Sequence, residues 1–243
     1  MATFTLTKPT DRTRTRRSLR VVSVCLLVFA VILSILVYMG VLGGNVRTVS
    51  EGKVYRSAQL TGHSVQSRIA AWSGAGLETV LQERQIKTVI NLRGGSTKDD
   101  WFREESAACK SAGAEQVTLR MSALRYPPPD ELKKLLFTFD HAAYPILFHC
   151  QGGADRSGLT GAIYLHLYEN VPLQSALHRE LTWRYGHISW GKAHAMDDFF
   201  ALYNRTGHGL GLREWIVTKY SGLYEQLPIS EREGGKDLSP AGS

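Results

Sequence analysis

A polar, basic segment opens the chain, and an apolar run without any charged residue follows it from Val21 to Leu42. A helix of about 20 apolar residues is long enough to cross the roughly 30 Å hydrocarbon core of a bilayer. A cleaved signal peptide has a shorter apolar core of about 7–15 residues and ends at a small-x-small site, which Gly40–Gly44 does not clearly offer. A buried core helix would show a polar face. The pattern therefore predicts one uncleaved transmembrane helix over residues 21–42.

Beyond this run, short β-branched or apolar stretches alternate with amphipathic ones. Strands are predicted at 54–57, 86–93, 115–122 and 144–150. Helices are predicted at 64–84, from Asp99 to Gly113, from Pro129 onward, at 157–170, and then at 172–185, 192–204 and 213–224. Strands that alternate with helices in this way are typical of an α/β fold, with a mostly parallel central sheet flanked by helices.

The composition divides the chain into five parts. We expect a basic cytoplasmic tail at 1–20, the transmembrane helix at 21–42, a linker at 43–52, one folded domain at 53–227 and a disordered tail at 228–243. The linker and the last segment are assigned because both are rich in glycine and polar residues.

The net charge of +7 is unevenly distributed, because residues 1–20 hold six basic residues against one acid, Asp11. Positive charge before a membrane span favours a cytoplasmic N-terminus, so we expect the folded domain to be exported, into the periplasm if the cell is bacterial. The rest of the chain is nearly neutral and gives little reason to expect binding of nucleic acid.

The stretch HCQGGADRSG, from His149 to Gly158, lies between an apolar strand and an apolar helix. Glycines at 152 and 153 let backbone N–H groups turn inward, and such groups at a helix N-terminus form an anion site. The same field lowers the pKa of a nearby thiol, here Cys150, and favours its reactive thiolate. Arg156 adds a planar fork of donors that suits two phosphoryl oxygens. We therefore expect Gln151, Gly152, Gly153, Ala154, Asp155 and Arg156 to bind a phosphate that Cys150 attacks.

This stretch resembles the H-C-x-x-G-x-x-R-S/T signature of the cysteine-based protein tyrosine phosphatases, in particular the dual-specificity branch and its bacterial members. VYRSAQL and VINLR resemble less specific segments of the bacterial enzymes, and the likeness extends from about Val54 to Tyr224. The resemblance implies that Cys150 is the nucleophile, Arg156 the phosphate clamp and Ser157 a hydroxyl that assists release of the thiolate. It also implies that His149 orients the loop from behind.

The general acid is less clearly marked. In most dual-specificity phosphatases an Asp follows the strand before the signature strand, but here that stretch reads LRMSALRYPPPDE and its first acid is Asp130. Asp130 is more simply a first-turn residue of a helix. Asp155, directly before the arginine, resembles the acid proposed for myotubularins and certain bacterial phosphatases. We favour Asp155 and keep Asp130 as the alternative.

Together these features predict a phosphatase that hydrolyses phosphate monoesters, most plausibly protein phosphotyrosine, through a phosphocysteine. The alternatives are a phosphoinositide or inositol-phosphate phosphatase, and an inactive membrane-tethered module that binds phosphorylated ligands. The eight histidines lack ligand spacing, so we expect no metal and no cofactor. Cys109 leaves open a redox pair with Cys150, and Arg56 or Arg93 could lie beside the phosphate.

Overall fold

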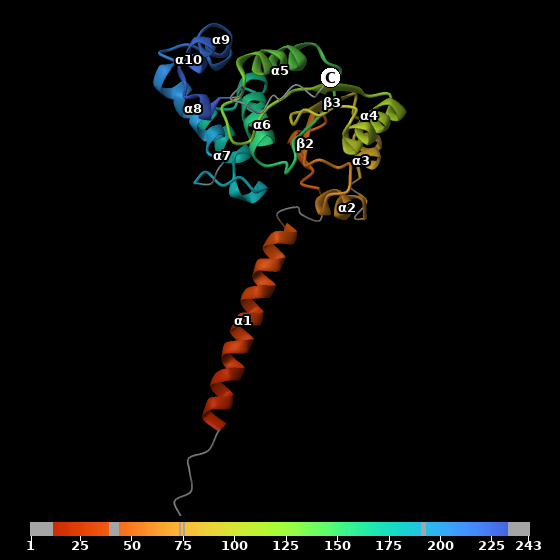
Figure 1. Cartoon of the computed structure of the whole chain (residues 1–243), viewed down its shortest axis with the longest axis vertical. Coiled ribbons are helices and arrows are strands. Elements are labelled where there is room, and N and C mark those ends of the chain that lie inside the picture. Colours follow the sequence, from red (N-terminus) through yellow and green to blue (C-terminus); the bar gives the residue numbers. More distant parts are fainter. Residues whose placement is uncertain (1–11, 39–43, 73, 75, 191–192, 233–243) are drawn as a thin grey trace, which may run out of the picture. The chain divides into compact units, whose positions relative to one another are not determined.

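The structure is a computed structural model of the chain, and it describes residues 12–38, 44–72, 74, 76–190 and 193–232 (Figure 1). It consists of two compact units, Met1–Tyr38 and Met39–Ser243. The expectations for residues 1–11, 39–43 and 233–243 fall outside the described residues.

The first unit contains one helix, α1 (Arg12–Tyr38). Its segment Ser18–Ile35 is long and apolar enough to cross a membrane, a criterion that a signal sequence near an N-terminus also meets. The helix begins at Arg12, within the segment expected to be the basic tail. Arginine and leucine favour helix, so the helical conformation extends ahead of the apolar run.

The second unit contains a five-stranded sheet in the order β1-β2-β5-β3-β4. Its strands are β1 (Arg47–Ser50), β2 (Val54–Ser57), β3 (Thr88–Asn91), β4 (Glu115–Thr118) and β5 (Ile146–His149). All neighbours are parallel except β1 and β2, so the predicted fold class is confirmed. Residues 43–52 were expected to be a linker, and this expectation is wrong at 47–50, where β1 pairs with β2. Only Val49 of this edge strand enters the core, so its sequence resembles a loop.

The helices of this unit begin and end close to the predicted positions. They are α2 (Val65–Trp72), α3 (Leu77–Glu83), α4 (Asp100–Ala112), α5 (Pro129–His141), α6 (Asp155–Tyr168), α7 (Leu173–Glu180), α8 (Ala195–Thr206), α9 (Leu212–Thr218) and α10 (Tyr220–Gln226), with short 3₁₀ turns at Trp183–Tyr185 and Ile229–Glu231. Three predicted helices are interrupted. The segment 64–84 divides around Gly74 and Gly76, and 172–185 divides after Glu180 into α7 and the 3₁₀ turn at Trp183–Tyr185. The segment 213–224 divides at Lys219, whose backbone leaves the regular helical conformation.

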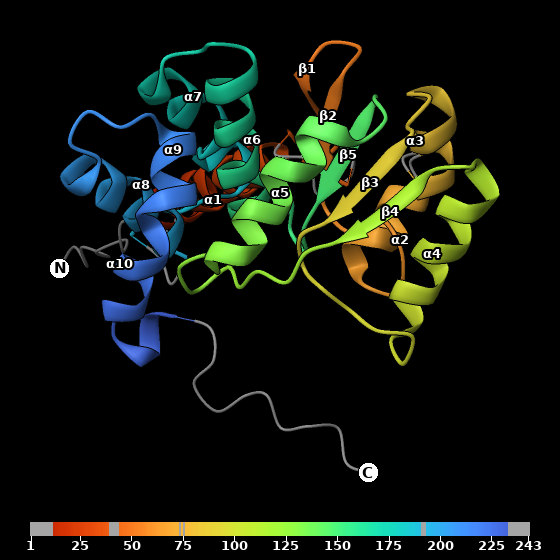
Figure 2. The ribbon, with the colours of Figure 1, turned by 90° about the horizontal axis from the view of Figure 1, so that it is seen from above.

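Two layers of helices cover the sheet (Figure 2). On one face, Val54, Ile90, Ile146 and Phe148 share a core with the helices α5, α6, α8, α9 and α10. On the other face, Tyr55, Val89 and Leu147 pack against α3 and α4. Successive residues of a strand point to opposite faces, and every residue of β2, β3 and β5 is buried, so these strands are covered on both sides.

The first residues of the predicted disordered tail, 228–243, are ordered against the domain. The N–H of Tyr126 donates to the carbonyl oxygen of Glu231 at 2.9 Å, and Tyr126 forms a parallel bridge with Arg232. This contact is made by backbone groups, and therefore no side-chain pattern indicates it.

Strand β5 lies between β2 and β3, parallel to both, and the carboxyl ends of the three strands are in register at Ser57, His149 and Asn91. Ligands of open α/β sheets bind at this edge, beside the point where the strand order reverses. Cys150 follows β5 directly, so the fold places the candidate loop there.

Candidate active site

The loop 150–154 connects β5 to α6, and packing requires only one of its two glycines. Gly153 has φ +68°, and a Cβ at this position would lie 2.6 Å from the backbone nitrogen of Ala58 and 2.8 Å from the carbonyl carbon of Ser57. Only glycine fits there, because backbone atoms of β2 and the residue after it cannot move aside. A Cβ on Gly152 would meet nothing within 4 Å, so packing does not require that glycine.

The loop presents several hydrogen-bond donors that the protein does not use. The backbone N–H groups of residues 151–154 donate to no acceptor among the described residues. Arg156 is 8% exposed, and its Nη1 donates to the carbonyl of Met121 at 2.9 Å, while its buried Nε has no partner. Free amides at the start of a helix, together with a guanidinium, suit a tetrahedral oxyanion such as phosphate.

Cys150 lies within this set of donors and is 1% exposed. Burial alone would raise the pKa of its thiol, but the charge of Arg156 and hydrogen bonds from the Ser157 side chain and backbone hold that pKa below its ordinary value. The hydroxyl of Ser157 is fully buried and also lies 3.5 Å from the carbonyl oxygen of Ser57. The surroundings therefore favour the thiolate, which is the nucleophilic form of cysteine.

His149 is fixed behind the loop by a carboxylate that the sequence did not indicate. Its Nε2 lies 2.8 Å from Oε2 of Glu105 on α4, and its Nδ1 lies 3.3 Å from the carbonyl oxygen of Cys150. Asn91 and Gln116 donate to the other oxygen of Glu105, at 2.9 and 2.6 Å. Burial would lower the pKa of His149, but Glu105 raises it above its ordinary value, and His149 in turn lowers the pKa of Glu105. This buried charged pair fits the expected orienting position of His149.

Arg56 on β2 holds the same loop by its carbonyl groups. Its Nη2 donates to the carbonyls of Gly153 and Ala154, at 2.7 and 3.0 Å. Its Nη1 forms an ion pair with Glu180 of α7 at 2.7 Å, and both side chains are almost completely buried. A Cβ at Gly161 of α6 would lie 2.6 Å from the Glu180 carboxylate, so this glycine lets α7 approach.

A third contact comes from Asn45, 107 positions before the loop. Its side-chain nitrogen donates to the carbonyls of Gly152 and Gly153, both at 3.1 Å, and to that of Tyr185 at 3.0 Å. Asn45 lies in the segment expected to be a linker and is 3% exposed. The residues that precede β1 are therefore part of the loop's support.

The two candidate acids lie in very different surroundings. Asp130 is almost fully exposed in the first turn of α5, where its carboxylate forms an ion pair with Lys133 at 3.7 Å. Asp155 opens α6 within the loop, and its Oδ1 lies 2.8 Å from Nδ1 of His187. The structure thus joins Asp155, but not Asp130, to the other loop residues.

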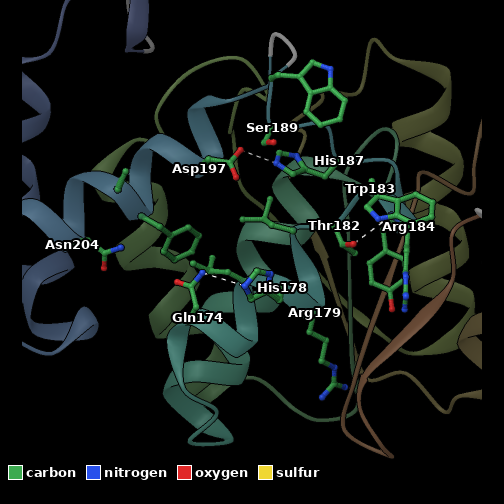
Figure 3. Close-up of a pocket in the computed structure, with 16 residues that line it drawn as sticks. Gln174, His178, Arg179, Thr182, Trp183, Arg184, His187, Ser189, Asp197 and Asn204 are labelled. Carbon is green, nitrogen blue, oxygen red and sulfur yellow. Dashed lines mark hydrogen bonds and ion pairs between the residues drawn. The ribbon is translucent and has the colours of Figure 1, made fainter.

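His187 continues this contact to a second carboxylate, since its Nε2 lies 2.8 Å from Oδ2 of Asp197 on α8 (Figure 3). His187 and Asp197 line a cavity of about 790 Å³ whose rim includes the exposed side chains of Trp183 and Trp190. Burial would lower the pKa of His187, but hydrogen bonds to Asp155 and Asp197 and their charges raise it to about 9.

A second, shallow hollow of about 410 Å³ lies beside Met121, the residue whose carbonyl holds Arg156. Arg93, Arg120, Ser96 and Ser122 line it. Burial and the charge of Arg156 lower the pKa of Arg93, which is stacked over Trp101 at 4.4 Å. Arg120 forms no ion pair within the described part of the chain. The hollow is therefore lined by two arginines and is basic.

Cys109 is a free thiol, buried in α4, like the free thiol of Cys150. Burial and the nearby charge of Glu105 raise the pKa of Cys109 to about 12. This thiol is therefore protonated at neutral pH and is a poor nucleophile for a redox exchange.

Three comparisons with known proteins bear on this geometry. No curated protein matches the chain. Among solved structures, the chain is similar to TpbA of P. aeruginosa, crystallised in complex with pTyr, with 22% identity over 67% of this chain and 93% of that one and a TM-score of 0.44. It is also similar to the core catalytic domain of the PP-IP phosphatase SIW14 from S. cerevisiae, with 18% identity over 68% and 94% and a TM-score of 0.46.

The family model described as "Tyrosine phosphatase family" matches residues 39–172, which is more than half of the chain. This range contains β1 to β5, the loop after β5 and the whole of α6. The chain therefore belongs to the tyrosine phosphatase family, and it is a phosphatase.

Proposed function

We propose that this phosphatase hydrolyses phosphate monoesters through a phosphocysteine on Cys150, and that its substrate is protein phosphotyrosine. The Cys150 thiolate attacks phosphorus and the bond to the leaving oxygen breaks, while Asp155 protonates that oxygen. Water then attacks the phosphocysteine, which releases inorganic phosphate and restores the thiolate. Arg156 and the loop amides stabilise the charge on the phosphoryl oxygens in both steps.

One observation carries this proposal: a thiol with a lowered pKa lies among unused amide donors and a buried, partly unpartnered arginine. A structural cysteine would be inert in an apolar environment. A module that only binds phosphate would need the donors but not an activated thiol. The combination therefore supports catalysis rather than binding alone.

The depth of Cys150 supports phosphotyrosine over phosphoserine or phosphothreonine. The residue is 1% exposed, so a phosphoryl group has to extend below the surface to reach the sulfur. A tyrosine ring carries its phosphate farther from the peptide backbone than the short side chains of serine and threonine do.

The basic hollow beside Met121 supports the second candidate, a phosphoinositide or inositol-phosphate phosphatase. An additional phosphate bound there would relieve the repulsion between Arg93 and Arg156 that lowers the pKa of Arg93. Charge-assisted bonds from arginine to phosphate are among the strongest hydrogen bonds in proteins.

A substrate panel separates the two candidates. We expect kcat/KM to be highest for phosphotyrosine peptides, and to be unchanged for them when Arg93 and Arg120 are replaced by Met. Higher kcat/KM on inositol polyphosphates or phosphoinositides, with an approximately tenfold loss in that double variant, would favour the second candidate instead. The double variant Lys98→Met and Lys110→Met also removes two positive charges, at exposed positions outside the hollow, and serves as the matched control.

The assignment of the acid is tested by comparing leaving groups. We expect Asp155→Asn to lower kcat about 10²-fold or more on an alkyl phosphate and much less on p-nitrophenyl phosphate, because a good leaving group hardly needs a proton. Asp130→Asn should leave both rates nearly unchanged, since Asp130 is exposed and forms an ion pair with Lys133 on the same helix. A selective loss on the alkyl phosphate in Asp130→Asn alone would show that the assignment is wrong.

We also propose that α1 is a single-pass anchor with its N-terminus in the cytoplasm, so that the catalytic unit is exported. The support is the length of the apolar segment and the basic residues ahead of it. A topology reporter fused after Ser243 should read as exported, and a cytoplasmic reading would contradict the orientation.

A further inference from the structure

Besides the reaction site, the side chain of Asp155 faces a histidine from another segment of the chain. Its partner His187 comes from the segment after the 3₁₀ turn Trp183–Tyr185, and Asp197 holds the other side of the His187 ring (Figure 3). Both ring nitrogens face carboxylate oxygens at 2.8 Å. Carboxylates only accept hydrogen bonds, so both nitrogens carry protons and the ring is an imidazolium.

The three side chains differ in their access to solvent. His187 is 2% exposed, whereas Asp155 is 23% and Asp197 is 39% exposed. One end of the series therefore lies in the catalytic loop, and the other end lies in the large cavity. A Cβ at Gly186 would contact the Ala154 side chain at 3.6 Å, so the segment carrying His187 packs directly on the loop.

We propose that Asp155, His187 and Asp197 form a proton relay, in which His187 stores the proton that Asp155 delivers to the leaving oxygen. The proposal rests on the proposed phosphocysteine reaction and on Asp155 as its acid. His187 touches no reacting atom and acts through Asp155, so it is a positioning residue that also holds a proton.

The relay balances over the two steps. When the bond from phosphorus to the leaving oxygen breaks, the Nδ1 proton of His187 passes to Asp155 and Asp155 passes a proton to that oxygen, so that His187 becomes neutral. When water attacks the phosphocysteine, the water proton passes to Asp155 and on to Nδ1, while the S–P bond breaks. The Nε2 proton stays on His187 and is hydrogen-bonded to Asp197 throughout, and the imidazolium is restored.

This arrangement explains how a carboxyl next to a cation can serve as an acid. The Nδ1 proton of His187 lies beside Asp155 at 2.8 Å, so His187 can supply the proton that Asp155 delivers. The proton on His187 is retained up to about pH 9, because the two carboxylates outweigh the effect of burial. The other titratable groups of the same cavity are His178 and Arg179 from α7, and Arg184 and Tyr185 from the 3₁₀ turn.

The test is the pH profile of kcat for the full-length protein on phenyl phosphate and on p-nitrophenyl phosphate. The pKa of His187 is raised to about 9, so the ring keeps its second proton below about pH 9 and loses it above that pH. We expect the rate on phenyl phosphate to fall as the pH rises through about 9. Asp197→Asn should move this fall to lower pH by about one unit or more, because one of the two stabilising charges is lost.

Two further variants complete the experiment. His187→Gln should lower kcat on phenyl phosphate about 10²-fold, hardly affect p-nitrophenyl phosphate and remove the alkaline fall. Asp198→Asn is the matched control, because Asp198 is the neighbouring carboxylate and its partner is His194. Its profile should equal that of the unmodified protein.

An unshifted alkaline fall in Asp197→Asn, or equal losses on both substrates in His187→Gln, would overturn the relay. Thermal unfolding of each variant shows whether a loss comes from the fold. Failure of the relay is distinct from failure of the proposed function, since the latter appears as full activity in Cys150→Ser, whereas the relay concerns only the pH profile and the leaving group.

Discussion

Replacing Cys150 by Ser is expected to lower the hydrolysis of p-nitrophenyl phosphate by more than about 10³-fold, because a serine hydroxyl ionises far less readily than a cysteine thiol and is a weaker nucleophile. The charge of Arg156 and the hydrogen bonds from Ser157 lower the pKa of the thiol in this loop. Steady-state release of p-nitrophenol by purified full-length protein measures the loss.

The same variant should still bind phosphate. The unused amides of residues 151–154 and the side chain of Arg156 remain in place, and serine is slightly smaller than the buried cysteine that it replaces. Inorganic phosphate should therefore raise the unfolding temperature of Cys150→Ser as it does that of the unmodified protein. Activity within about tenfold of the unmodified protein would rule out Cys150 as the nucleophile.

Glu180→Gln is expected to destabilise the folded unit by about 3–5 kcal/mol, because it leaves the buried charge of Arg56 without its counter-ion. The two charges are 2.7 Å apart and almost completely buried. For a unit of this size, the loss corresponds to a fall in unfolding temperature of about 6–20 °C. Differential scanning calorimetry of the full-length protein measures it.

Activity should fall with stability in this variant, since Arg56 also holds the carbonyls of Gly153 and Ala154. The matched control is Lys53→Ala, which removes an exposed pair with Glu169 at 3.2 Å. Exposed pairs contribute about 0–1 kcal/mol, so that control should unfold within a few degrees of the unmodified protein. An equally small effect of Glu180→Gln would show that the buried pair does not stabilise the loop.

The sequence pattern predicted the parts of the fold and site that depend on local spacing. The strands, the glycines of the loop and the positions of Cys150 and Arg156 lie close together along the chain and carry recognisable patterns. Asp155 was predicted as the acid for the same reason, because it lies directly before Arg156. The edge strand at 47–50 was missed, because one buried valine among polar residues has no strand signature.

Most side chains that support the loop from other elements could not be found in this way. Asn45, Glu105, Glu180 and His187 contact the loop residues or their partners from separate elements, at sequence distances set by the path of the chain. A single polar residue within a helix or a linker is compatible with a solvated surface position. Only the parallel register of β2, β5 and β3, and the packing of α4 and α7, show that these side chains are buried around one loop.

The most direct test of the account is to trap the covalent intermediate. Rapid acid quench of the full-length protein during turnover of p-nitrophenyl phosphate, followed by peptide mass spectrometry, shows where the phosphoryl group is attached. We expect it on Cys150, with none on Cys109 and none in Cys150→Ser. A phosphoryl group on another residue, or turnover in which Cys150 is never phosphorylated, would contradict the mechanism.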